Sequence, residues 1–311
     1  MTRTPRLFRL LPSPGITAAK VPEITVLFWV VKVLTTGMGE AASDYLGETN
    51  LILGGVVGVG GFVLALRLQL RAERYRAPVY WFCVSMIAVF GTILADVLHV
   101  ASGLPLWATS ALYALAVVVM FTWWRRSEGT LDVHSITTVR RERFYWATVL
   151  ATFALGTAVG DLTGLAMHLG FLPSGLLFTA AIAVPLLAWR AGASPIATFW
   201  AAYVLTRPLG ASFADWLGKE HSIGAGLGLG DGPVTLVAIV LIAVLVAVMV
   251  RRGDDVQRGV APVADIPPPG AGSGPSTNRK RSEPGDATVE RARHALSDAS
   301  TSERHDDGVT R

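Results

Sequence analysis

The sequence predicts an all-α integral membrane protein in which eight transmembrane helices form four parallel two-helix repeats, with both termini in the cytoplasm. Three observations predict this fold. The 311-residue chain is 51% apolar and only 16% charged, which sets it apart from ordinary soluble domains. It contains several apolar stretches long enough to cross a bilayer as helices. A short motif also recurs four times at regular spacing. We therefore expect neither a soluble enzyme nor a nucleic-acid-binding protein.

The recurring motif is an aromatic residue followed by tryptophan. A glycine stands ten residues after each tryptophan, and an aspartate stands fifteen residues after it. The tryptophans are Trp29, Trp81, Trp146 and Trp200, the glycines are Gly39, Gly91, Gly156 and Gly210, and the aspartates are Asp44, Asp96, Asp161 and Asp215. Agreement at three positions in each of four units indicates a tandem repeat.

Each repeat contains two apolar segments. The first helices are expected at residues 24–46, 79–99, 144–166 and 196–217, and the second helices at 51–70, 105–124, 172–190 and 233–250. The repeats then cover about residues 21–76, 77–140, 141–193 and 194–250. Residues 1–20 are basic and interrupted by prolines, and we interpret them as a cytoplasmic leader rather than a cleaved signal. Residues 251–311 are rich in Pro, Gly, Ser and Thr, which predicts a disordered cytoplasmic tail.

The positive charges predict the orientation of the helices. The links after the second helix of each repeat are rich in arginine, as at Arg71 and Arg126. The links after the first helices hold a single Lys or Arg, which is Lys219. Short cytoplasmic loops accumulate Lys and Arg, so every first helix should run outward. The expected location is the cytoplasmic membrane of a bacterium, with the lipid bilayer as the partner and no cofactor.

The repeated residues divide each first helix into zones. The tryptophan is expected at the inner membrane interface, where indole rings are favoured. The glycine would allow a neighbouring helix to approach closely. The aspartate lies about 22 Å beyond the tryptophan at 1.5 Å per residue. Four such helices that converge would place a ring of carboxylates near the outer surface.

Seven charged residues within the helices are the candidate substrate or ion pathway. They are Lys32, Glu40, Asp44, Asp96, Asp161, Arg207 and Asp215. Charged groups within a membrane are costly unless they pair or line a wet cavity, and here five acids face two bases. The excess of acid favours a cation or protons as the ligand. The alternative is structural, since an aspartate near the end of a helix can cap the turn that follows.

Three further features have weaker functional interpretations. Pro208 is expected to kink the seventh helix beside Arg207. His99, His168 and His221 should lie on the outer side, where imidazole and carboxylate together suit zinc or manganese. Their spacing does not repeat, which favours histidines at the interface over metal ligands. The glycine-rich stretch 224–230 lacks the preceding strand of a nucleotide-binding loop.

Several stretches carry a resemblance to a known family. They are residues 32–40 with Asp44, residues 156–161, and the Leu-Thr-Arg-Pro-Leu-Gly run 205–210 with Asp215. In them the chain resembles an uncharacterised bacterial family of membrane-anchored proteins, built of four tandem two-helix repeats of unknown function with one characteristic tryptophan each. The resemblance covers about residues 20–250. Ala95 departs from the hydroxyl or glycine that often precedes the second aspartate. The family implies a fold and no activity.

Two functions follow from these observations. The first hypothesis is a secondary transporter or permeation pathway for a metal ion or sodium, coupled to protons, in which the five acids bind and Lys32 and Arg207 act as internal counter-charges. The second is a scaffold or sensor that acts through its cytoplasmic tail while the repeats only pack together. A membrane enzyme is not expected, because no nucleophile with an adjacent base is visible.

Overall fold

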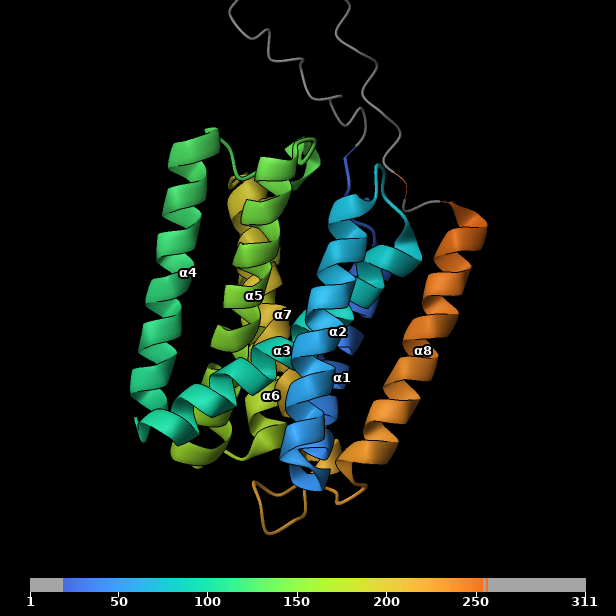
Figure 1. The fold of residues 1–311 in the computed structure, drawn as a ribbon. Coiled ribbons are helices and arrows are strands. Elements are labelled where there is room, and N and C mark those ends of the chain that lie inside the picture. The colour runs from blue at the N-terminus through green and yellow to red at the C-terminus, as the bar shows by residue number, and fades with distance from the viewer. Residues whose placement is uncertain (1–18, 254–255, 257–311) are drawn as a thin grey trace, which may run out of the picture. The chain divides into compact units, whose positions relative to one another are not determined.

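The computed structural model describes residues 19–253 and 256, and these residues form eight long helices without a strand (Figure 1). The first repeat contains α1 (Val26–Thr49) and α2 (Leu51–Arg71), and the second contains α3 (Ala77–Ser102) and α4 (Leu106–Glu128). The third contains α5 (Val139–Asp161) and α6 (Phe171–Arg190), and the fourth contains α7 (Pro195–Gly218) and α8 (Asp231–Arg252). The all-α prediction is confirmed, and each expected segment overlaps one helix.

Two short turns complete the described part of the chain. The 3-10 turn η1 (Val133–Ser135) precedes α5, and the π-helical turn η2 (Leu162–Ala166) continues α5 directly after Asp161. The predicted leader lies outside the described residues except for Ala19 and Lys20. The predicted tail lies outside them except for residues 251–253 and 256.

The first helices of the four repeats form the centre of the bundle. Helix α1 packs against α3 and α7, and α5 also packs against α3 and α7, so the four helices close a ring. Each second helix packs mainly on the first helix of the following repeat: α2 on α3, α4 on α5, α6 on α7, and α8 back on α1. Figure 1 shows α4 and α8 on opposite sides of this centre. The arrangement is an approximate fourfold ring in which the last repeat covers the first.

Six helices are long and apolar enough to cross a membrane: α2, α3, α4, α5 with η2, α6 and α8. The apolar windows of α2, α4, α6 and α8 are at most 28% buried, so these helices present apolar side chains to the outside of the bundle. Soluble proteins rarely expose apolar patches of that extent. The two helices that do not qualify, α1 and α7, carry the charged residues of the centre. The fold is that of a membrane protein.

The aromatic-tryptophan motifs form a closed belt at one end of the central ring. Each aromatic residue packs against its own tryptophan and against the tryptophan of the following repeat. Across repeats the ring centroids are 5.6 Å apart for Phe28–Trp81, 5.4 Å for Tyr80–Trp146, 6.1 Å for Tyr145–Trp200 and 5.7 Å for Phe199–Trp29. Trp81, Trp146 and Trp200 are buried. These three indoles pack inside the bundle rather than against lipid, and Trp29 is half-buried.

The repeated glycines also follow the fourfold ring. A methyl group at any of the four repeated glycines would lie 2.7 Å or less from a side chain of the neighbouring first helix. The glycines are Gly39, Gly91, Gly156 and Gly210. The neighbours are Ala88, Phe153, Arg207 and Thr36, which all stand eight residues before the aspartate of their own repeat. The glycines lie where the central helices approach most closely, and a larger residue would separate the helices.

Candidate functional site

The centre of the bundle contains a buried ion pair between α7 and α1. The Nη2 of Arg207 lies 2.9 Å from Oε2 of Glu40, and both side chains are at most 4% exposed. The Nη1 of Arg207 donates a hydrogen bond of 3.0 Å to the backbone carbonyl of Thr36. A buried charge is tolerated when a partner and hydrogen bonds satisfy it, and Arg207 meets both conditions.

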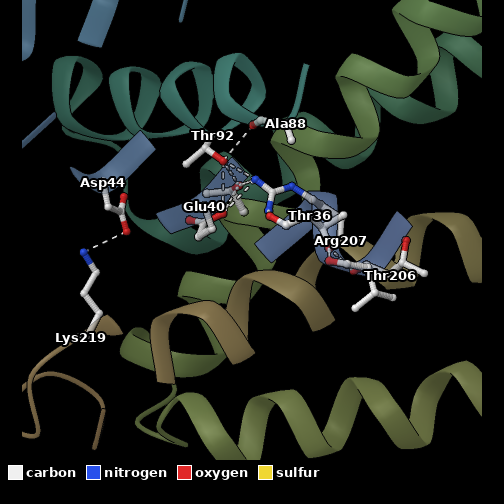
Figure 2. Close-up of polar contacts among 10 residues, drawn as sticks. Thr36, Glu40, Asp44, Ala88, Thr92, Thr206, Arg207 and Lys219 are labelled. Atoms are coloured by element: carbon white, nitrogen blue, oxygen red, sulfur yellow. Dashed lines mark hydrogen bonds and ion pairs between the residues drawn. The ribbon is translucent and has the colours of Figure 1, made fainter. Parts of the chain in front are cut away.

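Two threonines complete the polar centre (Figure 2). Arg207 Nη2 donates to the hydroxyls of Thr92 and of Thr157, the latter at 2.8 Å. Both hydroxyls in turn donate to Glu40 Oε2, at 3.2 and 3.1 Å. Glu40, Thr92 and Thr157 each stand four residues before the aspartate of their repeat, so equivalent positions of three repeats meet at one guanidinium. The fourth equivalent, Ala211, is small and buried.

Lys32 lies in the layer between this polar centre and the aromatic belt. Its Nζ is 4.2 Å from the centroid of the Phe153 ring and 4.4 Å from that of Tyr203. The amine is buried and has no hydrogen-bond partner among the described residues. The sequence suggested Lys32 as an internal counter-charge to the acids, but its amine forms no ion pair with a carboxylate of the described residues. It packs against aromatic faces, with the Phe153 ring also in contact with Arg207.

The repeated aspartates lie one helical turn beyond the polar centre. The structure brings Glu40, Asp44 and Asp215 together, with one carboxylate oxygen from each within 4.8 Å of the others. Asp96 and Asp161 do not join this group, although their carboxylates are close enough to Glu40 and Asp44 for electrostatic repulsion. The carboxylates of Asp96, Asp161 and Asp215 form no hydrogen bond or ion pair with any described residue. The structural alternative was that the aspartate caps the turn that follows. Asp161 does stand at the N-cap of the η2 turn, but its side chain forms no capping hydrogen bond there.

Lys219 supplies the positive charge at this end of the bundle. Its Nζ lies 2.9 Å from Asp44, 2.9 Å from Asp231 and 3.1 Å from Glu48 (Figure 2 shows its contact with Asp44). Burial works against the protonated form. The charges and hydrogen bonds of Asp44 and Asp231 stabilise the protonated amine by more than burial destabilises it. The pKa of Lys219 is therefore raised above its ordinary value. Lys219 is therefore a charged amine bound among three acids.

The glycine-rich stretch 224–230 holds this lysine in place. The backbone N–H groups of Leu227, Gly228, Leu229 and Gly230 donate to the carbonyls of Trp216, Lys219, Leu217 and Gly218 at the end of α7, at 2.7 to 3.0 Å. A methyl group at Gly226 would lie 2.0 Å from the Lys219 carbonyl. The glycines thus let the loop fold back and satisfy the last carbonyls of the helix.

The other sequence candidates lie apart from the carboxylates. His168 and His221 are exposed, and the Nδ1 of His99 lies 2.7 Å from the carbonyl of Leu104. Within the described chain, the group of ligand-type side chains around Glu40 contains carboxylates and no histidine. Helix α7 continues through Pro208.

Two features of these charges are visible only in the folded chain. Lys219 and Asp231 both lie between the expected seventh and eighth helices, and only the folded chain shows that Lys219 contacts both Asp44 and Asp231. The second feature lies at the opposite end of the bundle, where Lys20 pairs with Glu142 at 2.7 Å and Gln69 donates to the same carboxylate at 3.0 Å. Lys20 was counted as part of the leader, but it is 2% exposed and packs inside the bundle.

Fold and site together define a repeat-built membrane protein with a buried polar centre. The repeat of unknown function DUF347 matches the chain four times, at residues 27–75, 79–130, 144–192 and 198–254. The chain therefore belongs to that family, which confirms the resemblance inferred from its motifs. No curated protein and no solved structure matches the chain.

Proposed function

We propose that all eight helices span the cytoplasmic membrane of a bacterium, with both termini in the cytoplasm. The second helices end in arginine: Arg71, Arg125 with Arg126, Arg190, and Arg251 with Arg252. The even helices run in the same direction, so these arginines gather at one end, which the positive-inside rule favours as the cytoplasmic end. The charges of α1 and α7 face the bundle centre rather than lipid, which makes these helices tolerable as spans.

We further propose that the chain binds a cation at the outer carboxylates and transports it by secondary transport, in exchange with protons. The supporting observation is the approach of Glu40, Asp44 and Asp215 to within 4.8 Å of one another. Arg207 pairs with Glu40 and Lys219 pairs with Asp44, whereas the carboxylates of Asp96, Asp161 and Asp215 have no ion-pair partner among the described residues. Oxygen ligands without histidine suit hard cations such as Na⁺, Ca²⁺, Mg²⁺ or Mn²⁺. Close carboxylates also share protons, which couples cation binding to proton release.

The polar centre would act as the inner barrier in this mechanism. The Arg207–Glu40 pair, the two threonines and Lys32 fill the axis below the carboxylates, and the aromatic belt closes the end beyond them. Glu40 belongs to both the pair and the carboxylate group. A cation that binds Glu40 would therefore compete with Arg207, and release of the arginine would open the path inward.

The test is cation flux into proteoliposomes under an imposed pH gradient, with a panel of Na⁺, Ca²⁺, Mg²⁺ and Mn²⁺. The informative variant is Asp215→Asn, because the Asp215 carboxylate has no hydrogen-bond or ion-pair partner among the described residues. Glu220→Gln is the matched control, since it removes an exposed acid outside the group near the same end. We expect flux in the wild type and the control, and loss of flux in Asp215→Asn.

Two results would contradict the proposal. One is equal flux in the wild type and Asp215→Asn, which would remove the carboxylates from the pathway. The other is no flux of any tested cation in folded, correctly inserted protein. That second result would favour the scaffold or sensor hypothesis. Deletion of residues 254–311 separates the two functions, because a transporter keeps its flux and a scaffold loses its cellular effect.

A further inference from the structure

A second site lies on the side of the bundle, at the end opposite the outer carboxylates. A cavity of about 660 Å³ lies between α1, α6 and α7 and is bounded at one end by the η1 turn. Its size falls within the range of roughly 300–1,000 Å³ for sites that bind drug-sized molecules. Leu186 and Trp189 on its wall are 45% and 52% exposed, so the cavity opens to the side of the bundle.

The walls of the cavity are apolar and aromatic. Trp29 of α1, Trp189 of α6 and Phe199 of α7 contribute rings, and the remaining wall is mainly aliphatic with Pro185 of α6. The Trp29 and Phe199 rings pack against each other with centroids 5.7 Å apart, so the closed belt holds two of the three rings in place. Aromatic faces attract cations as well as apolar groups.

The charged end of the cavity is acidic. Glu23 and Asp132 line it, and none of the described residues that line the cavity is a lysine or an arginine. His134 lies between the two acids, with Nδ1 3.0 Å from Asp132 and Nε2 3.8 Å from Glu23. The carboxylates are about 40% exposed and therefore accessible to a ligand. An apolar volume with two acids at one end fits a molecule that carries a positive charge on a hydrophobic body.

We propose that this cavity is a binding site for lipophilic organic cations, such as aromatic amines or phosphonium compounds. The aromatic walls bind the apolar body, and Glu23 and Asp132 select the positive charge. A neutral lipid chain would use the walls but gain nothing from the acids, and an anion would be repelled by them. The proposal is independent of cation transport at the outer carboxylates, because no residue is shared between the two sites.

The experiment uses two probes of matched shape and opposite charge. Tetraphenylphosphonium and tetraphenylborate are titrated into the full-length protein in neutral-lipid nanodiscs, with empty nanodiscs as the blank. Binding is followed by isothermal calorimetry and by quenching of tryptophan fluorescence. We expect saturable binding of the phosphonium and no saturable binding of the borate.

Three variants locate the site. Glu23→Gln and Asp132→Asn should each weaken phosphonium binding roughly 3- to 10-fold, as expected for loss of one partly exposed charge contact. Asn keeps an acceptor for the hydrogen bond from the His134 backbone N–H to Asp132. The matched control is Glu73→Gln, which removes an exposed acid at the same end but outside the cavity. Ala202→Phe, which places a ring in the cavity, should abolish binding.

The outcomes either support or overturn the proposal. Equal binding of both probes would show an apolar groove without charge selection and would overturn it. Equal weakening by Glu73→Gln would assign the effect to general surface charge and would also overturn it. A thermal unfolding curve for each variant separates lost binding from lost folding, and the Gln and Asn variants should unfold at the wild-type temperature.

Discussion

The guanidinium of Arg207 contacts one residue from each of the other three repeats, Glu40, Thr92 and Thr157, and also the Thr36 carbonyl. Four similar repeats would give four similar side chains at the position four residues before each repeated aspartate. The chain instead has Glu, Thr, Thr and Ala at that level, with arginine entering from one turn away. The asymmetry has a physical reason, since one arginine paired with one glutamate and hydrogen-bonded to two threonines satisfies both buried charges at this level.

The first prediction concerns this ion pair. Glu40→Gln should lower the free energy of unfolding by about 3–5 kcal/mol, because the buried charge of Arg207 loses its partner. Arg207→Met should be comparably destabilising. The double variant should recover part of the loss, so the cycle should show strong coupling in thermal or denaturant unfolding. Additive effects of the two substitutions would contradict a direct pair.

The second prediction concerns Lys219. Its pKa is raised in the folded state, so its stabilising effect is complete below the unfolded value of about 10.4 and is lost only as the pH rises through the folded value. Lys219 should therefore occupy the acids throughout the neutral range. Lys219→Gln should tighten binding of an added divalent cation and lower the stability of the cation-free protein. Unfolding with and without Ca²⁺ or Mn²⁺ at several neutral pH values measures both effects, with Lys219→Arg as the control that keeps the charge.

Within single elements, helix packing depends on small residues at fixed positions. Gly39 and Gly47 lie on the same helix, α1, but in different surroundings. A methyl group at Gly39 would lie 2.3 Å from the Cβ of Ala88 and 2.7 Å from its carbonyl carbon, whereas nothing lies within 4 Å of one at Gly47. The backbone of α3 cannot yield at Ala88 without a shift of the whole helix.

The third prediction follows from this matched pair. Gly39→Ala should destabilise the protein by about 1–3 kcal/mol through overpacking. Gly47→Ala should be neutral or stabilise by up to about 1 kcal/mol, because alanine favours the helix. Thermal unfolding of the two variants side by side checks the prediction. Equal effects would mean that the contact of α1 with α3 is looser than the structure shows.

At the scale of the whole molecule, the ring closes only when the fourth repeat is present. Helix α8 covers α1, and the belt closes through Phe199 and Trp29. The fourth prediction is that a chain ending at residue 193 fails to fold, because α1 loses both α7 and α8. A chain ending at residue 253 should keep the wild-type unfolding temperature. Detergent-solubilised yield, size-exclusion profile and unfolding temperature distinguish the two truncations.

The fifth prediction tests the orientation of the bundle. A fluorescent protein fused after residue 253 should be fluorescent, since that end is expected in the cytoplasm, and alkaline phosphatase fused there should be inactive. Phosphatase fused within residues 220–223, at the other end of α7, should be active. The reverse pattern would invert the bundle and place the carboxylates on the cytoplasmic side.

The sequence by itself determined the helices, the four repeats and the family, because apolar length and recurring spacing are local properties of the chain. It also predicted Glu40, Arg207 and the aspartates as candidates, since charge within an apolar helix is visible without a structure. Only the tertiary structure decided which charges pair. Lys32 packs against aromatic rings, whereas Lys219, which follows the end of α7, pairs with Asp44. Which charges pair depends on which residues of different repeats lie side by side at the bundle axis. The close contacts at the repeated glycines set how the central helices align, and this alignment involves residues far apart in the sequence.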